Sequence, residues 1–171
     1  MKKFPYKKDL IGSRITGQYR TCDLAGFEFT LSSGKKLALH SFCFIRFFDS
    51  EILLLVTNNM YGPKSTIAEE DRGNFKWDEP GESLFDEVFE KYQEKLFSTK
   101  VKKVTFKNND LRLYFENGML LEFLADTTKY DDHNCCENFR IFERYGKHFV
   151  VDFFGGSFSG QEEINDGGTN E

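Results

Sequence analysis

The chain has 171 residues and a mass of 20.0 kDa, a size that fits one compact domain. It carries 23 Lys and Arg against 28 Asp and Glu, a net charge of -5, so we do not expect nucleic acid as a partner, because that binding needs surplus cations facing phosphates. The 39% apolar content exceeds that of disordered chains, and no apolar run approaches the roughly 18 residues of a membrane-spanning helix.

The N-terminal segment, Met1 to Lys8, is basic, but no apolar stretch follows it. It therefore does not resemble a secretory signal. We expect a cytoplasmic protein in a reducing compartment, with no membrane association. The cysteines are then expected to be free thiols; they are Cys22, Cys43, Cys135 and Cys136.

Residues 1–57 are predicted to form a first β-meander. Apolar and polar residues alternate over 27–31, the pair Ser33-Gly34 follows, and 37–39 is a second short run, which together predict a hairpin. Residues 42–48 and 52–56 are more continuously apolar. Such runs predict strands that are buried on both faces or lie at the centre of the fold.

Residues 58–81 are predicted to form an acidic, aromatic loop. Turn-forming pairs recur through the segment, and long loops inside a compact domain are often functional; the pairs are Asn58-Asn59, Gly62-Pro63, Gly73-Asn74 and Pro80-Gly81. Residues 82–97 then place apolar side chains three and four positions apart, which predicts a connecting amphipathic helix. Ser83 and Asp86 resemble a capping box at its start.

Residues 98–154 are predicted to form a second β-meander, with Asn117-Gly118 as the strongest hairpin signal. Residues 155–171 are rich in Gly, Ser, Asn and Glu, and we expect them to form a flexible acidic tail.

The two strand regions resemble each other. With an offset of 84 positions, Gly34 aligns with Gly118, and five apolar positions around it also coincide. We infer a five-strand antiparallel meander used twice, although alternating patterns also align by chance. The predicted fold is mostly β (α+β), with two related antiparallel meanders forming a sandwich or partly open barrel and one amphipathic helix between them.

Charge is concentrated in the middle of the chain. Residues 69–95 hold ten acidic and four basic residues, a net charge of -6. Such a block is typical of a solvated surface, but it can also steer a basic partner into contact.

The loop at 58–81 combines aromatic and acidic side chains, as protein interfaces with an apolar anchor and a charged rim do. The predicted partner-binding residues are Tyr61, Glu69, Glu70, Asp71, Phe75, Trp77, Asp78 and Glu79. The alternative is that Phe75 and Trp77 cap the open end of the β core.

A second candidate site is the loop that holds Asp131, His133, Cys135 and Cys136, all of them residue types that bind zinc. Adjacent cysteines seldom ligate one metal together, and no C-x-x-C pair completes a set. We therefore expect no metal or other cofactor. No nucleophile elbow, P-loop or dinucleotide fingerprint is present, so catalytic residues are not predicted.

The segment from Gly12 to Gly17 and the hairpins at 29–34 and 115–118 resemble those of uncharacterised bacterial proteins with two β-meander repeats. Some of these are predicted immunity proteins of polymorphic toxin systems. The resemblance implies a non-catalytic protein-binding protein whose partner is a basic toxin domain. The alternatives are a small-ligand- or metal-binding module or an enzyme that uses the Asp131–Cys136 loop, and a structural or regulatory subunit. The oligomeric state is left open.

Overall fold

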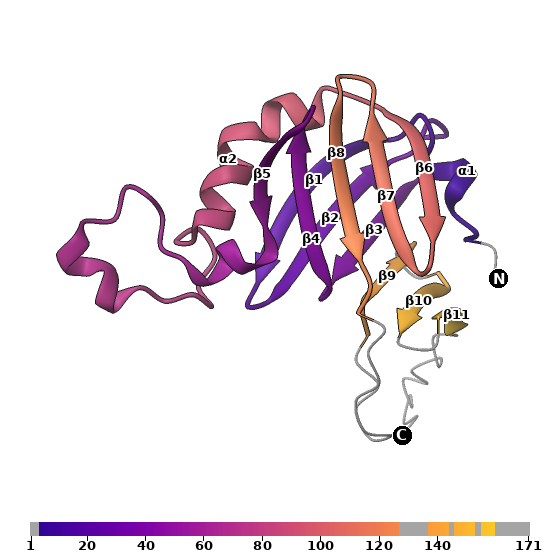
Figure 1. The fold of residues 1–171 in the computed structure, drawn as a ribbon. Coiled ribbons are helices and arrows are strands. Elements are labelled where there is room, and N and C mark those ends of the chain that lie inside the picture. Colours follow the sequence, from indigo (N-terminus) through magenta and orange to yellow (C-terminus); the bar gives the residue numbers. More distant parts are fainter. Residues whose placement is uncertain (1–3, 127–136, 144–145, 153–154, 160–171) are drawn as a thin grey trace, which may run out of the picture.

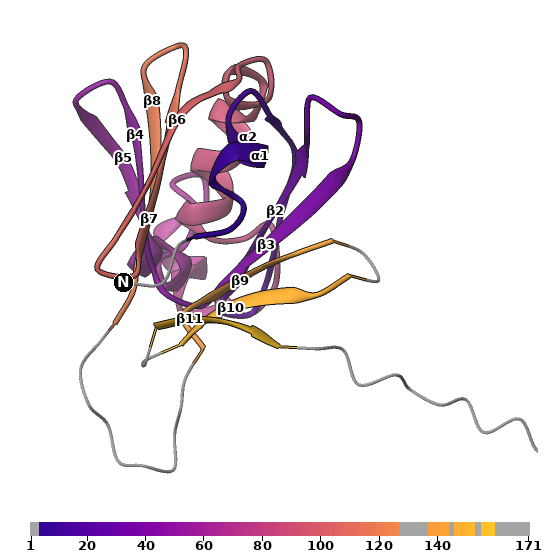
Figure 2. The ribbon, with the colours of Figure 1, turned by 90° about the vertical axis from the view of Figure 1, so that its right-hand side faces the viewer.

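The computed structural model describes residues 4–126, 137–143, 146–152 and 155–159 (Figure 1). In these residues eleven strands form two antiparallel sheets that face each other (Figure 2). The mostly β (α+β) sandwich is therefore confirmed. Among the described strands none pairs across the two sheets, so they do not close into a barrel.

The strands of the two sheets are as follows. Sheet A has six strands in the order β1 (Arg14–Thr21), β2 (Leu24–Thr30), β3 (Lys36–Ser41), β9 (Phe139–Phe142), β10 (His148–Asp152) and β11 (Gly155–Ser159). Sheet B has five strands in the order β5 (Ile52–Val56), β4 (Phe44–Asp49), β8 (Met119–Leu124), β7 (Asp110–Phe115) and β6 (Val101–Lys107).

The two predicted halves do not form one sheet each. The first half places β1–β3 in sheet A and β4–β5 in sheet B, and the second half places β6–β8 in sheet B and its remaining strands in sheet A. The halves join where β3 pairs with β9 and β4 pairs with β8. The internal repeat stays a prediction, although the two glycines that it aligns occupy similar left-handed turn positions, with φ of 83° at Gly34 and 87° at Gly118.

Two expectations about individual strands are wrong. The strand at 52–56 is not central: β5 is an edge strand, and Ile52 and Leu53 are 68% and 50% exposed. Its inner face packs on the core through Leu55, while the described residues leave Leu53 exposed on its outer face. The first residues of the expected tail are also part of the fold, because residues 155–159 pair with β10 as β11. The rest of that segment, 160–171, lies outside the described residues.

The helix α2 (Leu84–Phe97) closes the side of the sandwich between β1 and β5. The predicted capping box is confirmed, since Asp86 N donates to Ser83 Oγ and the Asp86 carboxylate accepts from Ser83 N. Phe89 points from α2 into the core, where its ring stacks on Phe47 of sheet B at 5.2 Å and meets Phe27 of sheet A edge-on at 5.6 Å. A short helix, α1 (Lys7–Leu10), packs against β6.

The segment between β5 and α2 projects from the sheets (Figure 1). It was predicted to be irregular, but it contains two 3-10 helices, η1 (Thr57–Tyr61) and η2 (Glu69–Asn74). We call residues 57–83 the lobe. No helix in the described part of the chain has the length and apolar character that crossing a membrane requires.

Candidate functional site

The lobe is anchored to sheet A by a buried arginine that the sequence did not single out. Arg20 of β1 is 4% exposed, and all three guanidinium nitrogens are used. They donate to the Asp86 carboxylate at 2.9–3.2 Å and to the backbone oxygens of Cys22 at 2.8 Å and of Trp77 and Glu79 at 2.6 Å each. One guanidinium therefore joins β1, the start of α2 and the arm of the lobe that leads into α2, at Trp77 and Glu79.

Asp86 is the charge partner of Arg20 and also caps α2. Burial alone would raise the pKa of its carboxyl group, but the hydrogen bonds from Arg20 and Ser83, together with the Arg20 charge, outweigh that effect and lower the pKa. Gly81 N donates to the same carboxylate at 3.0 Å. The ionised form of Asp86 is thus favoured by the contacts that close the base of the lobe.

The other arm of the lobe, which follows η1, is held by α2. The backbone N–H of Ser65 donates to Glu87 at 2.6 Å, its hydroxyl donates to the same carboxylate at 2.5 Å, and Lys64 pairs with Glu90 at 3.2 Å. These hydrogen bonds from Ser65 lower the pKa of Glu87. The neck of the lobe is closed by the bridge between Pro63 and Ser83. Both arms are therefore held by hydrogen bonds, and the lobe is packed against the rest of the fold.

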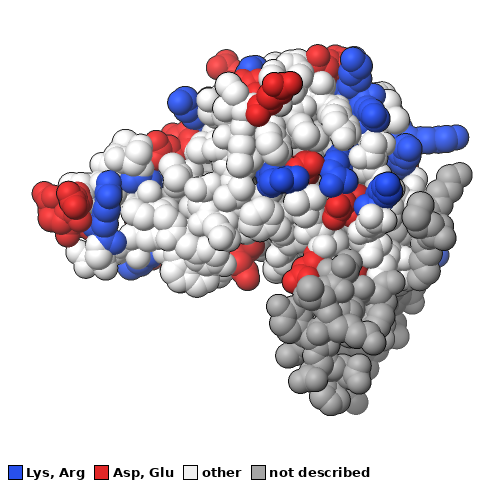
Figure 3. All heavy atoms as spheres, in the orientation of Figure 1, with Lys and Arg blue, Asp and Glu red and all other residues white. Residues whose placement is uncertain are grey.

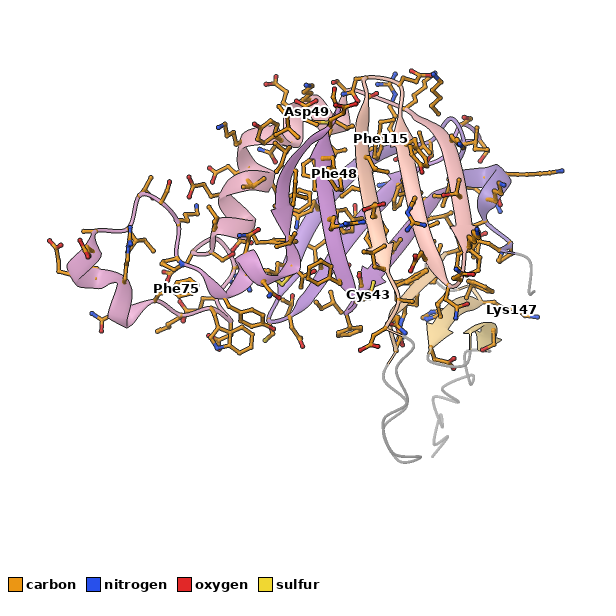
Figure 4. All side chains as sticks on the ribbon, viewed as in Figure 1. Cys43, Phe48, Asp49, Phe75, Phe115 and Lys147 are labelled. Atoms are coloured by element: carbon orange, nitrogen blue, oxygen red, sulfur yellow. The ribbon has the colours of Figure 1, made fainter. Side chains whose placement is uncertain are left out.

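The structure brings two of the predicted partner-binding residues together. The rings of Tyr61, at the end of η1, and Trp77 lie 5.3 Å apart between centroids. The residues are 53% and 41% exposed, so both present apolar surface to solvent. Phe75 is half-buried within the lobe (Figure 4), and neither Phe75 nor Trp77 is part of the hydrophobic core of the sandwich. Phe75 and Trp77 therefore do not cap the open end of the β core.

The predicted acidic residues divide into two groups. Glu69, Glu70 and Asp71 form the first turn of η2, are all exposed, and lie at the end of the lobe farthest from the sheets. Asp78 and Glu79 lie beside Trp77 in the chain, and the Glu79 carboxylate pairs with Lys76 at 2.7 Å. The whole lobe has six acidic and three basic residues, a net charge of -3. The acidic end of the molecule is visible in Figure 3.

The two described histidines are packed on the outer face of sheet A. His40 Nε2 lies 2.5 Å from the Tyr19 hydroxyl, and its ring meets Phe142 edge-on. Burial and the nearby Arg140 charge lower the pKa of His40, which favours its neutral form. His148 stacks on the other side of Phe142 at 4.5 Å. These contacts account for both rings as packing residues.

The second candidate site cannot be placed. Asp131, His133, Cys135 and Cys136 lie outside the described residues. Among the residues that the structure does describe, no three side chains of His, Cys, Asp or Glu gather closely enough to hold a metal ion.

Comparison of the chain with known protein families, with curated proteins and with solved structures finds no match.

Proposed function

We propose that this chain is a non-catalytic protein-binding protein that docks a basic partner through the lobe. The observation that carries the proposal is the exposed Tyr61–Trp77 pair, presented on an acidic segment whose base is fixed by buried Arg20. In its most specific form the partner is a basic toxin domain, and the lobe inhibits it by occupying or covering a cationic active site.

Both arms of the lobe are held by hydrogen bonds before any partner binds. Binding loses free energy when loops and side chains must be immobilised, and a segment already fixed at both arms avoids much of that loss. Tyr and Trp are the residues that most often dominate protein interfaces, because they bury a large rigid area around one polar group.

The acidic residues would act mainly on the rate of encounter. Charge at η2 attracts a cationic surface over a Debye length of about 8 Å at physiological salt. Such steering raises association rates, and added salt weakens it. The Tyr61–Trp77 pair is then expected to govern the dissociation rate, and the η2 carboxylates are expected to govern the association rate.

The experiment is affinity capture from a native lysate with four forms of the protein. They are the wild type, the Tyr61→Ala variant, the triple reversal Glu69→Lys/Glu70→Lys/Asp71→Lys, and a control reversal of equal charge. The control changes exposed acidic residues outside the lobe: Glu28→Lys, Glu94→Lys and Glu116→Lys.

We expect one stoichiometric basic protein with the wild type and the control, and much less of it with both lobe variants. Capture that is equal for all four forms would contradict the proposal, and so would a captured protein without a basic surface. Circular dichroism of each form checks that the fold is retained.

A further inference from the structure

The rings of Tyr61 and Trp77 are close enough to form one aromatic surface. Their centroids lie 5.3 Å apart and their planes are inclined at 49°, so the rings touch and leave no room for a side chain between them. A ligand of this pair must therefore lie on the ring surface that faces solvent. Both residues are exposed, so such a surface is present.

Three half-buried aromatic rings elsewhere in the protein are covered by cations of the same chain. The contacts are Arg46 over Phe48 at 5.6 Å, Lys91 over Tyr92 at 5.4 Å and Lys103 over Tyr114 at 5.1 Å. Among the described residues no Lys or Arg lies over Tyr61 or Trp77 in this way, although both are more exposed than those three rings. The lobe therefore leaves open the kind of ring face that the chain covers with a cation elsewhere.

Carboxylates outnumber cations beside Trp77. The ammonium of Lys76, the preceding residue, donates a hydrogen bond to Glu79 at 2.7 Å. That hydrogen bond raises the pKa of Lys76, and the charges of Glu82 and Asp78 raise it further. Three carboxylates are thus within electrostatic reach of one ammonium, so negative charge is in excess at this part of the lobe.

These carboxylates lie on the arm that carries Trp77, and that arm is bonded to the one that carries Tyr61. The backbone oxygen of Glu82 accepts a hydrogen bond from Lys64 N at 2.9 Å, three residues after Tyr61. In the part of the chain that the structure describes, the side chains of Asp78 and Glu82 form no salt bridge, so both carboxylates are available to accept from a partner.

We propose that the Tyr61–Trp77 pair is the binding site for an arginine side chain of the basic partner. The inference rests on the proposed function and names the chemical group that the lobe recognises. The π electrons of a ring face attract a cation, most strongly in Trp. A guanidinium stacked on that face directs its N–H groups sideways, in its own plane, toward carboxylates at the rim. The compact, strongly hydrated ammonium of lysine lacks this geometry.

Sheet B already contains the same arrangement within one chain. The guanidinium of Arg46 lies over Phe48, which is labelled in Figure 4, and contacts the Glu122 carboxylate at 2.6 Å. The lobe has the rings and the carboxylates, and a basic partner supplies the cation. The alternative occupant is an apolar pocket of the partner. Such a pocket would desolvate the neighbouring carboxylates without pairing them, which is unfavourable.

The test uses short peptides, so that it does not require the natural partner. The probes are tetra-arginine, tetra-lysine and tetra-citrulline, each acetylated and amidated; citrulline keeps the planar shape of arginine without its charge. Trp77 is the only tryptophan, so its emission reports binding in the wild type. The side-chain δ protons of arginine should also shift upfield in NMR spectra when the guanidinium stacks on a ring. We expect tetra-arginine to bind about threefold or more tighter than tetra-lysine, and tetra-citrulline not to bind.

Two variants remove one ring each and keep an apolar side chain, Tyr61→Leu and Trp77→Leu. Each should weaken tetra-arginine binding about threefold or more and reduce the upfield shift. Trp77→Phe, which keeps a ring, should retain most of the binding. Asp78→Asn should reduce the preference for arginine over lysine. The matched control is Phe44→Leu, because Phe44 is as exposed as Trp77, at 41%, but belongs to β4; it should change nothing.

Absence of saturable tetra-arginine binding at millimolar concentration would overturn the inference. So would equal binding of tetra-arginine and tetra-lysine, or an arginine preference that survives in folded Tyr61→Leu and Trp77→Leu proteins. Lysate capture separates these failures from failure of the proposed function. If the lobe captures a basic protein but shows no arginine preference, the inference fails and the proposed function stands. If the pair binds tetra-arginine as expected and no basic protein is captured, the proposed function fails although the site binds arginine.

Discussion

Replacing Arg20 with Met tests how the lobe is fixed. The substitution keeps a long apolar side chain but removes every hydrogen bond to Asp86, Trp77 and Glu79. Breaking a buried ion pair by removing one partner costs about 3–5 kcal/mol. Asp86 keeps its hydrogen bonds from Ser83, and the released carbonyl groups can regain water, so we expect a loss of about 3 kcal/mol in the free energy of unfolding.

The assay is equilibrium unfolding in urea, followed by circular dichroism for the sandwich and by fluorescence for the lobe. Trp77 is the only tryptophan in the chain, so its emission reports the lobe alone. In Arg20→Met the emission should move to longer wavelength before the sheets unfold. Arg14→Met is the matched control on the same strand. Arg14 is exposed, and among the described residues its side chain makes one hydrogen bond, to Ser98 O, so the loss should be at most about 1 kcal/mol.

A double-mutant cycle isolates the ion pair. The losses of Arg20→Met and Asp86→Asn should not add, since each removes the same contact, and a coupling of about 0.5–3 kcal/mol is expected. An Arg20→Met protein within about 1 kcal/mol of the wild type, with unchanged Trp77 emission, would refute the assignment of Arg20 as the anchor of the lobe.

Three further results are expected. Because the pKa of Asp86 is lowered in the folded protein, the stabilisation that Asp86 gives is complete above its unfolded pKa of about 4 and is lost as pH falls through its folded pKa. In urea titrations at several pH values, the wild type should therefore lose stability below about pH 4 more steeply than Asp86→Asn. Equal slopes would contradict this. Phe89→Ala should lower the free energy of unfolding by about 3–5 kcal/mol in the same assay, since its ring joins both sheets and α2, whereas a loss below about 1 kcal/mol would contradict that placement. Burial raises the pKa of Cys43 to about 12, so peptide mapping after brief alkylation of the folded protein near pH 8 should find the exposed Cys22 modified and Cys43 intact, and equal modification of the two would be inconsistent with the burial.

The elements that the sequence predicted well are those with local signals. The capping box at Ser83 and Asp86 sets where α2 begins, and Asn117-Gly118 marks the turn between β7 and β8. Alternation of apolar and polar residues located most strands to within a few positions. Each of these patterns spans a few neighbouring residues, so one sequence is enough to detect it.

The features that escaped sequence analysis depend on contacts between distant segments. Nothing near Arg20 in the chain indicates that its guanidinium is buried against residues 77–86. The pairing of β3 with β9, in which His40 lies opposite Arg140, likewise joins segments about a hundred residues apart. The position of β5 was misjudged for a related reason. An apolar run shows that a strand prefers cover on both faces, but it does not show whether the same chain provides that cover.

The central claim is that the lobe steers and binds a basic partner, and the association rate tests it most directly. The rate constant would be measured by surface plasmon resonance between the captured basic protein and the wild type, the Glu69→Lys/Glu70→Lys/Asp71→Lys variant, and the charge-matched control, at low and high salt. The account predicts fast association at low salt for the wild type and the control, slower association for the lobe variant, and rates that converge as salt rises. An association rate that is unchanged by the lobe reversal at low salt would contradict it.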